Sequence, residues 1–331
     1  MISQTQSPQD ARIQWSADDY SNFGRVTQVL SHSYDQLPLF ETASLVALLD
    51  DYPRSHLQAF TMGTDPTRRD DWHSVDIGPN TTGRDIWKAV ARGRLWLNLI
   101  SIETHYSEYA ELVAALYRHL DQHCPHLGGP IPNFSTLLIS SPGAQVYYHL
   151  DAPANMLWHL RGQKRIWIYP AMDLRFVPQQ YLEDIYTYEH DEFLPYRPEF
   201  DRYAEQLLLT PGKAAAWPRN APHRIENVDM NVSLTTSYRS PQQLRRDRVQ
   251  FANRYLLRPL GIAPRPMDET GLVSEIKQFS YRAINKIRPF KRRSNPHSKY
   301  ITYLRLDPEA PNGIRKLDQA IPASFRVLEE N

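Results

Sequence analysis

The chain has 331 residues, 41% of them hydrophobic, which is enough apolar material for one large domain or two ordinary ones. Lys and Arg number 38 against 37 Asp and Glu, so no overall charge favours nucleic acid or an acidic membrane surface. The single cysteine, Cys124, excludes an internal disulfide framework and a cysteine-rich zinc module. Residues 1–20 lack the apolar core of a secretory signal, and no stretch approaches the ~18 apolar residues that span a bilayer. We therefore expect a cytoplasmic protein without a membrane partner.

The first part of the chain, residues 1–132, has a mixed α and β texture. Apolar residues at helical spacing in 40–52 stop at Pro53, and residues 107–123 predict a second helix. Residues 56–63 and 95–102 are typical of strands. We expect this part to pack on the domain that follows.

Residues 133–240 consist of short β-prone runs separated by turn residues, which predicts a sandwich or a small barrel. A segment dense in Tyr, Pro and acidic residues interrupts these runs at 171–203, and an insertion of that length is typical of a lid or a binding loop. Residues 241–331 predict a helical C-terminal region, with a basic, proline-punctuated tail at 286–299.

Two potential metal ligands stand one residue apart in the second of these runs. Side chains alternate along a strand, so His149 and Asp151 are expected on one face together with Tyr147. His223 follows 72 residues after Asp151, in a proline-bounded loop. Two histidines and one carboxylate with open coordination positions form the facial triad of non-haem Fe(II) oxygenases. A His-x-Asp pair alone is a weak signal that also arises by chance.

The surrounding pattern resembles the JmjC-type, cupin-like Fe(II)- and 2-oxoglutarate-dependent oxygenases, in particular their asparaginyl-hydroxylase-like branch. The resemblance covers residues 133–240, and the helical flanks fit the family only loosely. The matching residues are His149, Asp151, Asn155, Gly162, Lys164 and His223.

The resemblance implies an α+β protein with a mainly β core, a double-stranded β-helix (jelly-roll or cupin) barrel with helical N-terminal and C-terminal flanks. It implies that His149, Asp151 and His223 bind Fe(II), that 2-oxoglutarate chelates two further positions and that O₂ takes the last. In this family a strand lysine pairs with the distal carboxylate of 2-oxoglutarate, and Lys164 stands in that place. The implied reaction is hydroxylation of an unactivated C–H bond with release of succinate and CO₂.

A turn at Arg161-Gly162 would pair strands 155–160 and 163–168 as a hairpin. His159 would then lie opposite Lys164, and Asn155 and Lys164 would face the same interior. For His159 this predicts a hydrogen bond to the co-substrate or to Tyr147, rather than metal ligation.

Further residues are expected at the co-substrate. Tyr147 and Asn155 face the metal ligands, and a hydroxyl of the strand 231–239 is expected to assist the carboxylate: Ser233, Thr235 and Ser237 share one face, and Thr235 is the candidate we name. Arg239 competes with Lys164 as the anchor, because other 2-oxoglutarate oxygenases use an arginine after the distal histidine.

Two other polar clusters are expected to be structural. His119, His123, Cys124 and His126 superficially resemble a zinc site, but a frayed helix end is the more common outcome of such a pattern. The basic tail 286–299 is expected to be solvated, so a nucleic-acid partner is not favoured.

The substrate class stays open between a protein side chain and a small molecule, because fold does not select a substrate. The alternative function is a non-catalytic, cupin-like metal- or ligand-binding regulatory protein. Apolar stripes in 241–285, which include Phe251, Ile276 and Phe279, predict a homodimer through the C-terminal helices.

Overall fold

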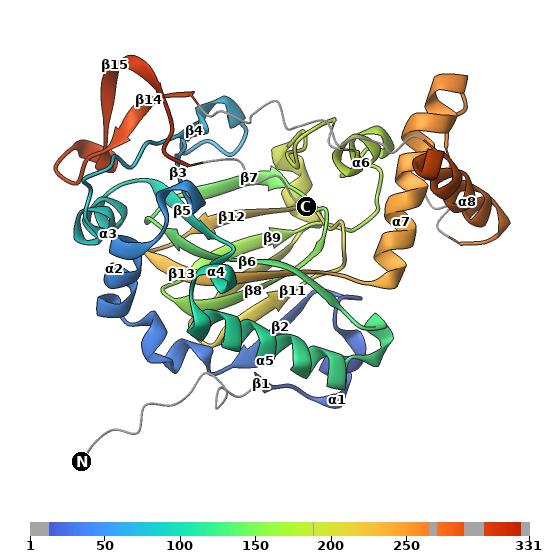
Figure 1. Ribbon diagram of the computed structural model, residues 1–331, viewed down its shortest axis with the longest axis horizontal. Coiled ribbons are helices and arrows are strands. Elements are labelled where there is room, and N and C mark those ends of the chain that lie inside the picture. Colours follow the sequence, from blue (N-terminus) through green and yellow to red (C-terminus); the bar gives the residue numbers. More distant parts are fainter. Residues whose placement is uncertain (1–12, 188, 265–269, 288–300, 326–331) are drawn as a thin grey trace.

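The computed structural model describes residues 13–187, 189–264, 270–287 and 301–325. Two antiparallel sheets form its centre (Figure 1). The strands are β1 Ile13–Gln14, β2 Gln28–His32, β3 Leu57–Thr61, β4 His73–Ser74, β5 Leu95–Ile100, β6 Ile131–Ser140, β7 Gln145–His149, β8 Ala154–Arg161, β9 Lys164–Ile168, β10 Glu205–Leu209, β11 Lys213–Ala216, β12 His223–Asn227 and β13 Asn231–Arg239. Among the described residues the larger sheet has nine strands in the order β1-β2-β11-β8-β13-β6-β5-β3-β4, and the smaller has four, β10-β9-β12-β7.

From β6 to β13 the chain passes back and forth between the two sheets, and only β9 and β10 follow one another within the same sheet. β6, β8, β11 and β13 belong to the larger sheet, whereas β7, β9, β10 and β12 belong to the smaller one. A chain that crosses repeatedly between two antiparallel sheets is a double-stranded β-helix, the jelly-roll arrangement. The predicted fold class, a mainly β core of this type with helical flanks, is confirmed.

The space between the two sheets is apolar in its middle. Leu157 on β8 and Ile166 on β9 are 1% and 0% exposed and belong to one buried cluster with Trp217 and Ile225. Alternation places the odd-numbered residues of β8 in this interior and the even-numbered ones, such as Trp158, in a second core outside the larger sheet. Polar side chains at either end of the interior are therefore separated by a dry layer.

Helices from the first part of the chain cover the outer face of the larger sheet (Figure 1). Thr82 and Asp85 form a capping box that begins one of these helices. Leu49, Ile86 and Leu116 come from three different helices and are fully buried in the same core as Trp158. The helices are α1 Ala17–Asn22, α2 Thr42–Asp51, α3 Gly83–Arg92, α4 Ile102–His105 and α5 Ser107–His123.

The predicted hairpin of residues 155–168 is wrong. β8 pairs with β11 and β13, and β9 pairs with β10 and β12, so the turn at Arg161-Gly162 carries the chain from one sheet to the other. Short strands joined by a tight turn look alike in sequence whether they pair or cross between sheets. His159 and Lys164 still face the same interior, because the two sheets bring them together from opposite sides.

A β-bulge in β7 corrects the predicted strand face. His149 pairs with His223 and Val146 pairs with Ile225, so two residues of β7 lie opposite the single residue Arg224. The bulge shifts the alternation so that Val146, and not Tyr147, shares the interior with His149. Tyr147 packs instead with Met62 beside the edge of the smaller sheet.

The insertion 171–203 packs on the outer face of the smaller sheet. It contains α6 Gln179–Tyr186, and its apolar residues, such as Phe176 and Leu182, form one buried cluster with Tyr148 and Tyr169. Its last part extends the sheet: the Leu150 N–H donates to Glu192 O at 3.0 Å, and the Leu194 N–H donates to Tyr148 O at 3.1 Å. That it acts as a lid or binding loop stays a prediction.

The C-terminal region contains α7 Pro241–Ala252 and α8 Leu272–Ile287, which lie to one side of the barrel (Figure 1). A two-stranded sheet, β14 Ile301–Leu306 with β15 Ile314–Pro322, follows them and corrects the expectation of a purely helical region. Thr302 donates to Ser74 O at 2.5 Å and Arg305 pairs with Asp76 at 2.8 Å, so this sheet packs against the N-terminal part.

The predicted division at residues 132 and 240 stays a prediction, and β2 and β5 of the first part share the larger sheet with barrel strands. Most of the basic tail 286–299 lies outside the described residues. No helix in the described ranges is long and apolar enough to cross a bilayer.

Candidate metal and co-substrate site

His149, Asp151 and His223 come together at one end of the barrel interior. His149 ends β7 and His223 begins β12, so strand pairing sets the two rings side by side, 4.1 Å apart between centroids. Asp151 follows two residues after His149, with its carboxylate oxygens 3.8 Å from His149 Nε2 and 3.5 Å from His223 Nε2. One ligand atom from each residue lies within 4.8 Å of the others, and among the described residues no other such group of three occurs.

Both histidines turn the same nitrogen toward the carboxylate. His149 Nδ1 donates to Tyr147 O at 2.8 Å and His223 Nδ1 donates to Ala221 O at 3.2 Å, because a carbonyl oxygen only accepts. Nδ1 therefore carries a proton in each ring, and these bonds select the tautomer whose lone pair is on Nε2. This is the state in which an imidazole binds a metal, with the other ring nitrogen held by a backbone carbonyl.

The surroundings keep these ligands oriented and His223 neutral. Burial, followed by the neighbouring His149, lowers the pKa of His223 to about 4, and its side chain is 3% exposed. Asn155 donates through Nδ2 to Asp151 Oδ2 at 3.0 Å and so fixes the carboxylate. Trp217 packs on His223 with ring centroids 4.7 Å apart. Two imidazoles and a carboxylate form a donor set that fits a divalent transition metal.

Lys164 lies at the other end of the interior. It pairs with Asn227, the last residue of β12, whereas His223 is the first residue of that strand. Four residues, or roughly 13 Å along β12, separate the two positions. The Lys164 side chain is 1% exposed, and burial lowers the pKa of the ammonium group to about 7. Nζ donates to Ser233 Oγ at 3.0 Å, and no carboxylate in the described part of the chain forms an ion pair with it. A buried ammonium group is costly unless an opposite charge meets it.

His159 contacts neither Tyr147 nor a metal ligand. Its ring bridges Ser233 Oγ, at 3.0 Å from Nδ1, and Gly162 O, at 2.8 Å from Nε2. The predicted bond to Tyr147 is therefore wrong, since the bulge moves Tyr147 to the barrel's edge.

The other predicted co-substrate residues lie at different depths. Thr235 faces the interior and donates to Thr136 O at 3.3 Å, whereas Ser233, two residues away, contacts Lys164. Arg239 ends β13, six residues or roughly 20 Å beyond Ser233. The placement favours Lys164 over Arg239 as the group deep in the barrel. The roles of Tyr147, Asn155 and Thr235 toward a co-substrate stay predictions.

Sequence reasoning missed the aromatic rim beside the metal ligands. Phe193, from the insertion, forms a β-bridge with His149 and lies 5.9 Å from its ring. Trp72 packs on Phe193 at 5.8 Å, and Arg69 stacks over Phe193 while it pairs with Asp191. Arg69 and Trp72 lie more than a hundred positions before Phe193 in the chain. No local sequence pattern predicts a contact between such distant segments.

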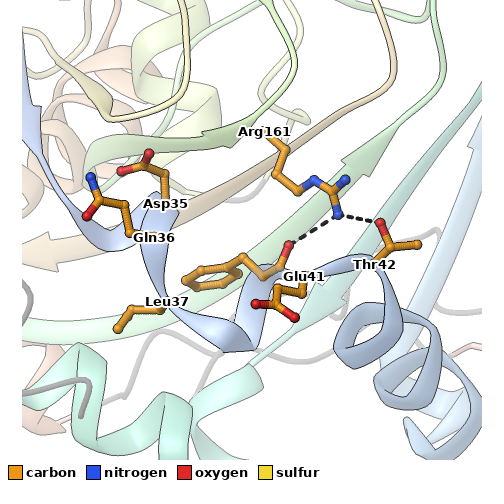
Figure 2. A pocket seen from close by; sticks show the side chains of 7 residues that line it. Asp35, Gln36, Leu37, Glu41, Thr42 and Arg161 are labelled. Atoms are coloured by element: carbon orange, nitrogen blue, oxygen red, sulfur yellow. Dashed lines mark hydrogen bonds between the residues drawn. The ribbon is translucent and has the colours of Figure 1, made fainter. Parts of the chain in front are cut away.

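A separate hollow has no triad residue in its lining (Figure 2). Arg161 reaches across it, donating to Thr42 Oγ1 at 2.8 Å and to Phe40 O at 3.2 Å. The guanidinium group is thus engaged by the protein itself, and the hollow offers no metal-ligating cluster. Its lining residues are Asp35, Gln36, Leu37, Phe40, Glu41, Thr42 and Arg161.

The histidines at the end of α5 contact other side chains of the protein. His119 hydrogen-bonds Tyr20 at 2.9 Å, and His123 stacks on the Tyr20 ring.

No protein-family model matches the chain, and no curated protein matches it. Escherichia coli YcfD aligns with a TM-score of 0.50 at 17% identity, over 85% of this chain and 71% of that one. A structure described as the ribosomal oxygenase YcfD in complex with cobalt and 2-oxoglutarate aligns with a TM-score of 0.47 at 16% identity, over 85% and 70% of the two chains. A cupin superfamily protein of Desulfitobacterium hafniense aligns over 33% of this chain and 69% of its own, with a TM-score of 0.21 at 12% identity. The alignment with YcfD at a TM-score of 0.50 shows a shared fold, in agreement with the barrel predicted from the sequence.

Proposed function

We propose that this protein is an Fe(II)- and 2-oxoglutarate-dependent oxygenase that hydroxylates an unactivated C–H bond and releases succinate and CO₂. The observation that carries the proposal is Lys164, a fully buried ammonium group without a carboxylate partner among the described residues, in the same interior as a His-Asp-His cluster. A buried charge is costly unless an opposite charge meets it. A dicarboxylate that binds the metal at one end and the lysine at the other supplies that charge.

His149, Asp151 and His223 would hold the iron. Two imidazole Nε2 atoms and one carboxylate are the donor set of non-haem Fe(II) oxygenases, and they leave positions open for other ligands. When bound, Fe(II) would activate O₂ in a reaction coupled to the oxidative decarboxylation of 2-oxoglutarate. The residues themselves contribute orientation: the carbonyls of Tyr147 and Ala221 hold the rings, and Asn155 holds the carboxylate.

The apolar layer between the two ends would keep the co-substrate dry. Leu157, Ile166 and Ile225 line it and are at most 7% exposed. Water excluded from this layer cannot screen the attraction between Lys164 and the distal carboxylate. The chain thus provides one polar end for chelation, one cationic end for anchoring and apolar side chains to contact the carbon chain between them.

The substrate would enter beside Phe193 and Trp72, next to His149. The proposal covers a protein side chain and a small molecule. Ribosomal proteins are the first candidates to test, because a structural neighbour is described as a ribosomal oxygenase.

The test is incubation of the purified protein with Fe(II), 2-oxoglutarate, O₂ and candidate substrates, followed by mass spectrometry and succinate analysis. We expect a substrate to gain one oxygen atom in step with succinate. Binding of metal and 2-oxoglutarate without any succinate would instead indicate a regulatory binding protein and overturn the oxygenase proposal.

We also propose a homodimer formed through the C-terminal helices. On α8, Leu272, Ile276 and Phe279 are 77%, 57% and 72% exposed, whereas Ser274 and Gln278 are buried. The helix thus presents its apolar stripe outward. Covering these side chains in a second copy would stabilise association by about 1.5–3 kcal/mol for each one fully buried.

A further inference from the structure

We propose that His159 is a positioning residue for the co-substrate: it orients the hydroxyl proton of Ser233 so that the serine oxygen accepts from Lys164 and holds the ammonium group toward the interior. The proposal rests on the proposed function, because it concerns how that function's anchor is held. The residues involved come from three strands, β8, β9 and β13, that meet only in the folded barrel.

The direction of the hydrogen bonds starts from the backbone. His159 Nε2 lies 2.8 Å from Gly162 O, and a carbonyl oxygen only accepts, so Nε2 carries the proton. Gly162 holds this carbonyl in a turn with φ +70°, where a Cβ atom would meet Met230 O at 2.3 Å. The turn that takes the chain between the sheets therefore also sets the tautomer of His159.

The other ring nitrogen of His159 is an acceptor. Burial, followed by the charge of Lys164, lowers the pKa of His159 to about 3, so the ring is neutral and Nδ1 keeps its lone pair. Ser233 Oγ lies 3.0 Å from Nδ1 and must donate its only proton there. The serine oxygen is then left with acceptor capacity alone.

Lys164 completes the chain of donors. Nζ lies 3.0 Å from Ser233 Oγ and donates to it, so the order is Lys164 to Ser233 to His159 to Gly162. An ammonium group has three N–H bonds, and two remain for the oxygens of a carboxylate. A hydroxyl that can only accept also stabilises the ammonium form over the neutral amine.

The remaining ionisable neighbours do not compete for this role. His32, on β2, is neutral because burial lowers its pKa to about 4; its Nδ1 accepts from the Tyr34 N–H and its Nε2 donates to Lys213 O. Lys213 pairs with His159 in register but directs Nζ to Ser31 Oγ at 3.0 Å.

The experiment is calorimetric titration of 2-oxoglutarate into the Mn(II)-loaded, full-length protein without O₂. His159→Leu removes the acceptor for Ser233, whereas His159→Asn places an amide oxygen close to the position of Nδ1. Losing the oriented hydroxyl should weaken 2-oxoglutarate binding about tenfold in His159→Leu, with His159→Asn within about threefold of wild type. Mn(II) affinity should be unchanged in both variants.

A second measurement separates positioning from a merely structural role. In His159→Leu the Ser233 hydroxyl is free to donate to a neutral amine, so the loss of 2-oxoglutarate affinity with rising pH should begin at lower pH than in wild type. His159→Asn should restore the wild-type profile. Equal binding by wild type and His159→Leu, or an unchanged pH profile, would overturn the proposal.

Ser233→Ala keeps the proposal testable if His159→Leu does not fold. It removes the link itself and should weaken 2-oxoglutarate binding about tenfold, again with Mn(II) affinity intact. Wild-type affinity in Ser233→Ala contradicts the role of His159. A wild-type protein that fails to bind 2-oxoglutarate would instead contradict the proposed function itself, so the two failures are distinguishable.

Discussion

His149 and His223 are direct cross-strand partners on β7 and β12, and their ring centroids lie 4.1 Å apart. They share a face because a β-bulge beside Arg224 resets the alternation of β7. The bulge also leaves Tyr147 O free to accept from His149 Nδ1. One local irregularity therefore places the first ligand and fixes its tautomer.

Removing one ligand should abolish metal binding. Loss of residues that merely support ligands already costs 10–100-fold in metal affinity, so His223→Ala should weaken Mn(II) binding at least ~100-fold. His119→Ala is the matched control, because His119 is a half-buried histidine that contacts Tyr20 and is not part of the triad. Equilibrium dialysis measures both. Full Mn(II) affinity in His223→Ala would show that the metal binds at another site.

Replacing the buried lysine should separate stability from co-substrate binding. Lys164→Met removes an ammonium group that is 1% exposed and without a carboxylate partner among the described residues, so the free energy of unfolding at pH 7 should rise by about 1–4 kcal/mol. The same variant should lose 2-oxoglutarate binding. Urea denaturation and calorimetry give the two quantities, and a variant that is both less stable and still able to bind 2-oxoglutarate would refute the assignment.

The two candidate anchors make different predictions. Lys164→Ala should weaken 2-oxoglutarate binding by about 3–5 kcal/mol, because a desolvated carboxylate loses its charged partner. Arg239→Ala should change it far less, because Arg239 lies at the far end of β13 from Ser233. The reverse ranking in calorimetry would transfer the anchor to Arg239.

Co-substrate affinity should fall as the pH rises above about 7. Burial lowers the pKa of Lys164 to about 7 in the folded protein, against about 10.4 for an exposed lysine, so above pH 7 the folded protein holds a neutral amine there. A bound carboxylate restores the ammonium group, which requires uptake of one proton. Calorimetry in buffers of different ionisation enthalpy should report nearly one proton taken up at pH 8 and nearly none at pH 6. No uptake at pH 8 would show that Lys164 stays charged without a ligand.

The stability of the ligand-free protein should respond to pH in the opposite sense. Between pH about 7 and about 10.4 the unfolded chain binds more protons than the folded one, so the Lys164 contribution to the free energy of unfolding rises with pH. Lys164→Met should lack this contribution. Parallel denaturation curves at pH 6.5 and pH 8.5 compare the two proteins.

The proposed dimer depends on the apolar stripe of α8. Ile276→Glu together with Phe279→Glu should yield a monomer, because a charged side chain in an apolar contact is costly. Leu208→Glu, at a side chain on β10 that is 53% exposed, serves as the control. Light scattering at micromolar concentration decides the matter, and a monomeric wild type would remove the dimer.

Much of the site could be predicted because its residues are close in sequence and chemically distinctive. His149, Asp151 and Lys164 fall within sixteen positions, His223 stands in a proline-bounded loop, and the resemblance supplied the role expected of Lys164. The bulge at Tyr147 could not be predicted, because an inserted residue changes which side chains face inward without changing the β-prone composition. The contact between Phe193 and His149 depends on how the insertion folds back, which no periodicity records.

For the fold, too, some features could be predicted from the sequence and others could not. Short β-prone runs predict a barrel, yet they do not tell whether β8 and β9 pair or cross between sheets. Residues 301–306, with alternating β-prone side chains, carried a strand signal that the basic tail before them obscured. On α8 the apolar residues are periodic, but periodicity does not say which face meets α7.

The most direct test of the central claim is succinate formation after O₂ is added to the anaerobic complex of Fe(II), 2-oxoglutarate, the candidate substrates and the full-length protein. Wild type should form succinate in the presence of O₂ and not without it, whereas His223→Ala and Lys164→Ala should form little under the same conditions. Succinate at equal levels in wild type and His223→Ala, or none above background in wild type, would contradict the assignment of this barrel as a 2-oxoglutarate oxygenase.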